Sequence, residues 1–107
     1  MSLGPAARPV ATPADADATN VVKASGLVEL PIGVRWSGSP KTYDLDSRVD
    51  RLRVYEQVLR EGTDDDVRRF IDVDQLIDLW DELVLPSHVR AAWARWLSEH
   101  RSLDLAC

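Results

Sequence analysis

The fold is decided by residues 46–101, which read DSRVDRLRVYEQVLREGTDDDVRRFIDVDQLIDLWDELVLPSHVRAAWARWLSEHR. Apolar residues return in this stretch every three or four positions, which is the spacing of one face of an α-helix. Turn and capping residues interrupt the pattern at Gly62, at Asp72 and at Pro86, so no apolar segment is long. The stretch therefore predicts an all-α fold, a compact bundle of about four short helices with tight connections.

The expected helices can be bounded from their capping residues. Asp46 is the predicted N-cap of the first helix, since a carboxylate accepts bonds from the free amides of the first turn. Gly62 is predicted to end that helix in the left-handed conformation. Two capping boxes are predicted at the next two helix starts, from Thr63 with Asp66 and from Asp72 with Gln75. The four helices should then span about Ser47–Glu61, a short segment opened by Thr63, about Val73–Val84 and about His88–Arg101.

The apolar positions of these helices are expected to form one core. Trp80, Trp93 and Trp96 lie on the apolar sides of their helices, and each buries a large area, so we predict that they serve folding rather than contact with a partner. The other expected core residues are Val49, Leu52, Val54, Tyr55, Val58, Leu59, Val67, Phe70, Ile71, Leu76, Ile77, Leu79, Leu83, Val84, Val89, Ala92 and Leu97.

The residues before the bundle divide into two segments. Residues 1–26 are rich in Ala, Pro, Asp and Thr without apolar periodicity, which predicts a disordered tail that contributes nothing to stability. Residues 27–45 hold apolar and β-branched residues interrupted by Pro and Gly, which predicts an extended arm along the helices. We expect one short strand there at most and no sheet. Residues 46–107 form the expected helical domain.

Charge narrows the class of partner. The net charge is −5 and the isoelectric point is near 4.9. Residues 46–107 hold fourteen acidic and nine basic residues, and eight of the acids fall between Asp64 and Glu82, against Arg68 and Arg69 alone. This balance argues against a protein that neutralises nucleic-acid phosphates or an anionic membrane surface. It predicts an acidic face on the second and third helices.

The sequence offers little for catalysis or metal binding. The two histidines, His88 and His100, stand in no metal-ligand spacing and are expected at helix ends. The single cysteine, Cys107, can form no internal disulfide, and there is no phosphate-binding glycine loop or GxSxG elbow. We therefore expect no enzyme activity, no cofactor and no metal. The lack of a signal-peptide core and of an apolar run of about 20 residues predicts a cytoplasmic protein.

Two groups of residues are candidates for contact with a protein partner. The arm combines aromatic and basic side chains, and the helices carry exposed acids. For the arm, the alternative is that Trp36 and Tyr43 fold back over the protein's own helices, and for the acids, that they form only a solvated helix face. The candidate residues are Arg35, Trp36, Lys41 and Tyr43 in the arm, and Asp65, Asp66, Asp81 and Glu82, with Asp74 and Asp78, on the acidic face.

Residues 34–105 resemble a group of small proteins encoded beside abortive-infection nucleotidyltransferase toxins of the AbiEii type in high-GC bacteria. The similar segments are VRWSG at 34–38, YDL at 43–45, VYEQVLREGTDDDVRRFID at 54–72 and LWDELVLP at 79–86. The resemblance implies an antitoxin. Antitoxins of this kind either bind the toxin or repress transcription, and the chain lacks the recognisable winged helix of the repressor type.

Three hypotheses follow for the function. The first is a protein that neutralises a nucleotidyltransferase by direct contact. The second is a small helical DNA-binding regulator, for which the fourth helix offers Arg90, Arg95 and Arg101. The third is an enzyme subunit that supplies only part of a site.

Overall fold

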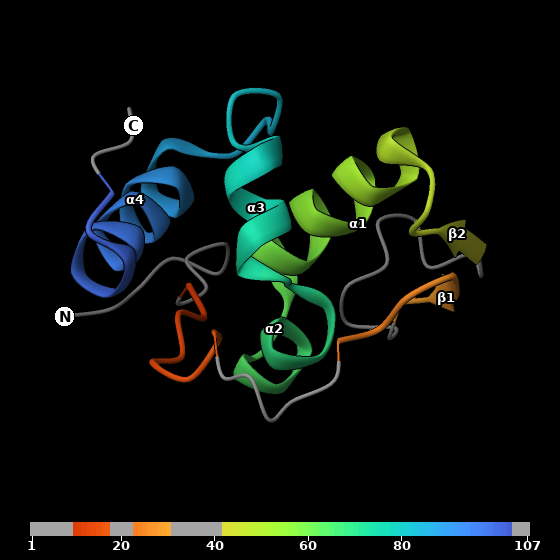
Figure 1. Cartoon of the computed structure of the whole chain (residues 1–107), viewed down its shortest axis with the longest axis horizontal. Coiled ribbons are helices and arrows are strands. Elements are labelled where there is room, and N and C mark those ends of the chain that lie inside the picture. Colours follow the sequence, from red (N-terminus) through yellow and green to blue (C-terminus); the bar gives the residue numbers. More distant parts are fainter. Residues whose placement is uncertain (1–9, 18–22, 31–41, 104–107) are drawn as a thin grey trace, which may run out of the picture.

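The structure, a computed structural model, describes residues 10–17, 23–30 and 42–103. These residues form β1 (Leu27–Glu29), β2 (Thr42–Asp44), α1 (Arg48–Glu61), α2 (Asp64–Phe70), α3 (Val73–Leu79) and α4 (Ser87–Arg101). Figure 1 shows α3 between α1 and α4, with α2 below them and the two strands beside the first turn of α1. The mostly helical fold predicted from the apolar spacing is confirmed. No helix in the described ranges is long and apolar enough to cross a membrane.

The two ends of α1 differ from the prediction. Ser47, not Asp46, is the N-cap, and its hydroxyl accepts a bond from the Asp50 amide. Gly62 ends the helix in an extended conformation, with φ −75° and ψ 158°, instead of the left-handed one. A Cβ at Gly62 would lie 2.6 Å from the Val58 carbonyl oxygen, so the position needs glycine for its missing side chain rather than for a positive φ.

The start of α2 confirms the predicted capping box, whereas at the start of α3 only the Asp72 half of the predicted box forms. Thr63 and Asp66 form a complete capping box, in which each side chain accepts a bond from the other residue's amide. The Asp72 carboxylate accepts bonds from two amides of the first turn of α3. Its own amide donates to the Tyr55 hydroxyl at 2.9 Å, and that hydroxyl also donates to Gln75 Oε1 at 3.1 Å. In a capping box, a side chain of the first helical turn accepts a bond from the N-cap amide, and at α3 the Tyr55 hydroxyl takes this role. Burial raises the pKa of the Tyr55 hydroxyl to about 12.

The third helix is shorter than predicted because it ends at Leu79, with Trp80 as its C-cap. The Trp80 and Leu83 carbonyl oxygens both accept bonds from the Arg90 guanidinium, which reaches back from α4. Helix ends leave carbonyls without partners inside the helix, and here a cation from the next helix binds the C-cap carbonyl and a second carbonyl beyond the turn that follows. The chain then turns through residues 80–82 and enters α4 after Pro86.

All three predicted core tryptophans are buried, with exposed fractions of 2% for Trp80, 0% for Trp93 and 4% for Trp96. The rings of Trp93 and Trp96 are 5.3 Å apart and tilted by 47°. Three of the expected positions differ: Val49 and Val84 are largely exposed, and Ala94 is buried in place of Ala92. The core also contains Val54, Tyr55, Val58, Leu59, Val67, Phe70, Ile71, Val73, Leu76, Leu79, Leu83, Val89 and Leu97.

The arm holds two strands where one was expected, so the all-α prediction is wrong for this segment. β1 and β2 pair antiparallel, with Val28 opposite Tyr43. The pairing continues past β2, where the Leu45 amide donates to the Gly26 carbonyl at 2.8 Å. Gly26 has a φ of 68°, the left-handed region that glycine adopts without strain. Strands of three residues joined mainly by backbone bonds leave little apolar alternation in a sequence.

Replacing Trp93 with Ala is expected to lower the free energy of unfolding by about 3–5 kcal/mol, because a completely buried large ring leaves a cavity among the helices. Chemical denaturation measures the change. The control is Val84→Ala, at a side chain that is 77% exposed, which should change stability by no more than about 0.5 kcal/mol. Equal effects of the two changes would contradict the assignment of Trp93 to the core.

Candidate functional site

The predicted arm residues lie only partly within the described chain. Arg35, Trp36 and Lys41 are outside the described residues. Tyr43 is 8% exposed, and its hydroxyl accepts a bond from Gln57 Nε2 at 2.9 Å. Tyr43 therefore packs on α1 of its own domain, which is the alternative to contact with a partner.

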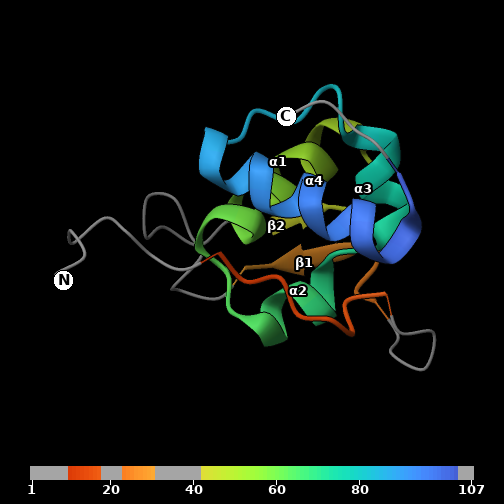
Figure 2. The same ribbon diagram turned by 90° about the vertical axis from the view of Figure 1, so that its left-hand side faces the viewer.

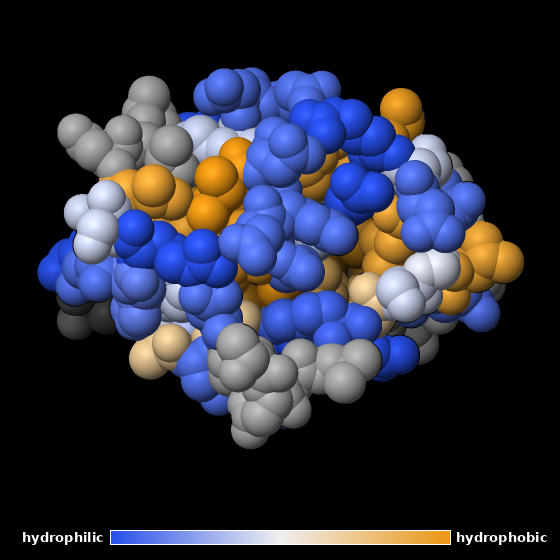
Figure 3. Space-filling model, in the orientation of Figure 1, coloured by the Kyte–Doolittle hydropathy of each residue, from blue (hydrophilic) through white to orange (hydrophobic). Residues whose placement is uncertain are grey.

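The acidic candidates form two groups rather than one face. Asp65 and Asp66 lie in the first turn of α2, whereas Asp78 is on α3 and Asp81 and Glu82 are in the turn that follows it. Figures 1 and 2 show α2 and that turn at opposite ends of the molecule. Figure 3 shows hydrophilic residues over the middle of one face, above α3. A partner that contacts one group need not reach the other.

Several of these carboxylates bind groups of the protein itself. Asp66 is part of the capping box, and Asp65 accepts a bond from Arg68 Nη1 at 2.8 Å. At the other end, Arg48 at the start of α1 donates to Asp78 at 2.7 Å and to Glu82. Asp81, by contrast, is exposed and has no ion pair among the residues that the structure describes. The capping role of Asp66 was expected from its spacing with Thr63, whereas the ion pairs of the other carboxylates are contacts that the sequence pattern does not record.

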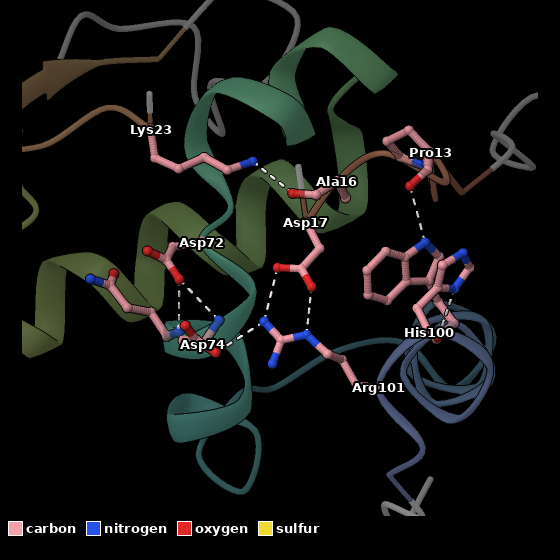
Figure 4. Close-up of polar contacts among 10 residues, drawn as sticks. Pro13, Ala16, Asp17, Lys23, Asp72, Asp74, His100 and Arg101 are labelled. Carbon is pink, nitrogen blue, oxygen red and sulfur yellow. Dashed lines mark hydrogen bonds and ion pairs between the residues drawn. The ribbon is translucent and has the colours of Figure 1, made fainter. Parts of the chain in front are cut away.

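A second site, which sequence reasoning missed, is formed by residues 10–17, the N-terminal strap. Figures 1 and 2 show the strap between α4 and α2. Its residues 13–16 form a turn closed by the Ala16 amide, which donates to the Pro13 carbonyl at 3.1 Å. The same carbonyl accepts a bond from Trp96 Nε1 at 3.0 Å (Figure 4). Pro13 is buried and Ala16 is fully buried.

Two arginines bind the carboxylates of the strap. Arg101, the last residue of α4, donates to Asp17 through Nε at 2.5 Å and Nη2 at 2.8 Å (Figure 4). Arg68 on α2 donates to Asp15 through Nε at 2.9 Å. These hydrogen bonds favour the ionised carboxylates and hold the pKa of Asp15 and Asp17 below the ordinary value of 3.8.

Lys23 fastens the chain again after the strap. Its ammonium donates to the Ala16 carbonyl at 2.8 Å and to the Arg68 carbonyl at 2.7 Å, and desolvation lowers its pKa. The Ala24 amide then donates to the Arg69 carbonyl at 2.8 Å. In the structure, residues 10–17 and 23–26 therefore contact α2 and α4, while the disordered tail stays a prediction from composition. Such contacts need few apolar residues, because charged and backbone groups bind partners up to 84 residues away.

One signal for the strap was present in the sequence. Pro13 is followed by Asp15 and Asp17 in an alanine background, so two carboxylates stand beside a turn-forming residue. The sequence does not say which cations they meet. His100 adds a contact from α4, since its ring stacks on Trp96 at 4.2 Å and its Nδ1 lies 3.0 Å from the Trp96 carbonyl oxygen.

No group of three or more His, Cys, Asp or Glu side chains in residues 10–17, 23–30 and 42–103 is arranged to hold a metal ion. No protein-family model, curated protein or solved structure matches the chain. The likeness to the proteins encoded beside nucleotidyltransferase toxins therefore stays a prediction.

Docking of the strap is expected to weaken in acid. The folded-state pKa of Asp17 is lowered, so its contribution is fully present above the ordinary value of 3.8 and is lost as the pH falls through the folded value. The resonance and exchange rate of the Trp96 indole N–H, followed from pH 6 to pH 2.5, report the change. Asp17→Asn should weaken docking at pH 6 and reduce its pH dependence, whereas Asp81→Asn should do neither.

A charge placed under the strap should release it. We expect Ala16→Glu to lower the free energy of unfolding by about 1–2 kcal/mol, because a buried carboxylate without a partner is costly and the strap can leave instead. Ala14→Glu, two residues away at an exposed position, is the matched control and should change stability by no more than about 0.5 kcal/mol. No loss in either variant would favour the tail without structural role that composition predicted.

Proposed function

We propose that this protein is a non-catalytic, cytoplasmic antitoxin that binds a nucleotidyltransferase toxin directly. The observation that carries the proposal is the sign of the charge left exposed on the helices. Residues 46–107 contain fourteen acidic and nine basic residues. Most of the basic side chains already form hydrogen bonds or ion pairs within the protein. The partner expected for such a surface is a basic protein.

The arginines of the helical part are largely occupied. Arg51 donates to the Leu45 carbonyl, Arg90 donates to the carbonyls of Trp80 and Leu83, and Arg95 pairs with Glu99. Arg48, Arg68 and Arg101 bind carboxylates, as described above. Among the exposed side chains of the helical part without an ion pair in the described ranges, the acids Asp46, Asp64 and Asp81 stand against the bases Arg53 and Arg69. The unpaired exposed charge therefore has a small negative excess, and Asp81 lies beside the partly neutralised Asp78 and Glu82.

A nucleotidyltransferase suits this surface for a chemical reason. Such an enzyme must attract a nucleoside triphosphate, and often an RNA acceptor, so the mouth of its site is expected to be positively charged. An acidic protein surface complements that charge and speeds the encounter. The arm residues Arg35, Trp36 and Lys41 remain candidates for the anchoring contacts, since aromatic and arginine side chains dominate binding hot spots.

The two other hypotheses gain less support. A DNA-binding helix needs arginines free to reach phosphates and base edges, and Arg90 and Arg101 of α4 donate to the protein's own oxygens instead. For the enzyme-subunit hypothesis, the one hydroxyl–carboxylate contact described above, Thr63 with Asp66, belongs to a helix cap. Retention on DNA at physiological salt separates the DNA-binding hypothesis from the proposal.

Charge reversal at Asp81 is expected to slow association with the toxin by about three- to tenfold at low salt and to flatten its salt dependence. The partner is the product of the neighbouring gene, and stopped-flow or surface binding measures the rate constants. Glu99→Lys on α4 makes the same change of net charge away from both acidic groups, and it should have a much smaller effect.

The contribution of the arm is measured separately, as the rate of dissociation from the partner. Trp36→Ala should speed dissociation while leaving the association rate nearly unchanged, because anchors act after docking. The proposal fails if the neighbouring product does not bind the wild-type chain, or if the variants at residues 36 and 81 bind as the wild type does.

A further inference from the structure

The surface under the strap has the properties of a peptide-binding site. It recognises backbone through Trp96 Nε1 and Lys23 Nζ, which bind the carbonyls of Pro13 and Ala16. It selects a small residue, because Ala16 is completely buried. Two arginines of the surface, Arg68 and Arg101, form ion pairs with the carboxylates of the strap. Backbone contacts, a small-residue pocket and paired arginines together specify a short acidic turn.

The two arginines are held in place without the strap. Arg101 donates through Nη2 to Asp74 on α3 at 3.0 Å as well as to the strap, and Arg68 donates through Nη1 to Asp65 on its own helix. Figure 4 shows Arg101 reaching both Asp17 and Asp74. When the strap leaves, each guanidinium keeps a carboxylate partner and is not stranded. This lowers the penalty of opening and leaves the site preorganised for another ligand.

The resident segment is weakly held. Its ion pairs join partly exposed side chains, and such pairs contribute little in water. Of the eight residues of the strap, only Pro13 and Ala16 are buried. A segment of this kind opens often in comparison with the helical core, so a competing peptide finds the site vacated.

We propose that the surface formed by Arg68, Trp96, Arg101 and Lys23 is a docking site for an acidic turn of a protein partner, with the pattern Pro-x-Asp-Ala-Asp. The strap is the site's own occupant and must be displaced. The two arginines require two carboxylates in the partner, and the buried positions of Pro13 and Ala16 require a proline before them and a small residue between them. The proposal concerns a site other than the exposed acids, and it holds or fails independently of the proposed function.

The test uses a blocked synthetic peptide with the sequence of residues 10–17, VATPADAD, carrying a fluorophore. The receptor is the full chain with Ala16→Glu, in which the strap is released and the receiving surface is unchanged. We expect saturable binding at least tenfold tighter than to the wild-type chain, where the strap competes at a high effective concentration. A peptide with both aspartates replaced by lysine should not bind.

A matched pair of receptor variants locates the site. In the Ala16→Glu background, Arg101→Gln should weaken peptide binding at least tenfold. Arg95→Gln, at an exposed arginine of the same helix, should leave it unchanged. Should Ala16→Glu fail to fold, Asp17→Lys replaces it, and titration of the wild-type chain followed at the Trp96 indole N–H gives the same answer.

Three results would overturn the proposal. The first is no saturable peptide binding to a folded receptor whose strap is released. The second is equal binding to the Arg101→Gln and Arg95→Gln receptors. The third is concentration-dependent dimerisation of the wild-type chain by exchange of straps, seen by sedimentation and abolished by Ala16→Glu, which would make a second copy the occupant.

Discussion

Short helices place one constraint on this protein above all others: their ends must be capped. α2 and α3 have seven residues each, so nearly every backbone group in them belongs to a first or last turn. Side chains bind those groups, with Asp66 and Asp72 at the starts and Arg90 at the end of α3. The Tyr55 hydroxyl, buried under the start of α3, completes the set. Without these contacts the tryptophan core would have no fixed elements to pack between.

The same constraint determines which parts of the fold could be predicted. Caps are local, so Thr63 and Asp72 were identified from three-residue spacing, and the helices between them followed. The two wrong predictions at the ends of α1 are also local. At its start, Ser47 takes the capping role predicted for the neighbouring Asp46. At its end, Gly62 is needed for lack of space for a side chain and not for a left-handed backbone. The strands and the strap depend on partners far away in the sequence. Val28 meets Tyr43, and Asp17 meets Arg101, with no periodicity that records either contact.

Capping also changes the meaning of the acidic composition. A run such as Asp64-Asp65-Asp66 suggests a binding surface, yet Asp66 caps a helix and Asp65 holds Arg68. The candidate site could therefore be predicted only as a composition, an excess of acids over bases, and not as a set of free residues. When the carboxylates with internal partners are excluded, Asp81 is the stronger candidate for contact with a partner. In the arm, Tyr43 was a predicted contact residue, but it is buried in the protein's own core.

The two proposed sites are coupled through charge. While the strap is docked, Arg68 and Arg101 each lie between two carboxylates, so Asp15 and Asp17 are largely neutralised. Release of the strap separates both aspartates from their arginines, while Asp65 and Asp74 keep the arginines bound. The unpaired negative charge therefore rises when the strap leaves. The basic partner proposed for the exposed acids is therefore expected to bind the open form more tightly than the closed one. Linkage then requires that such a partner also favours release of the strap. Salt weakens this coupling because the groups involved are partly exposed.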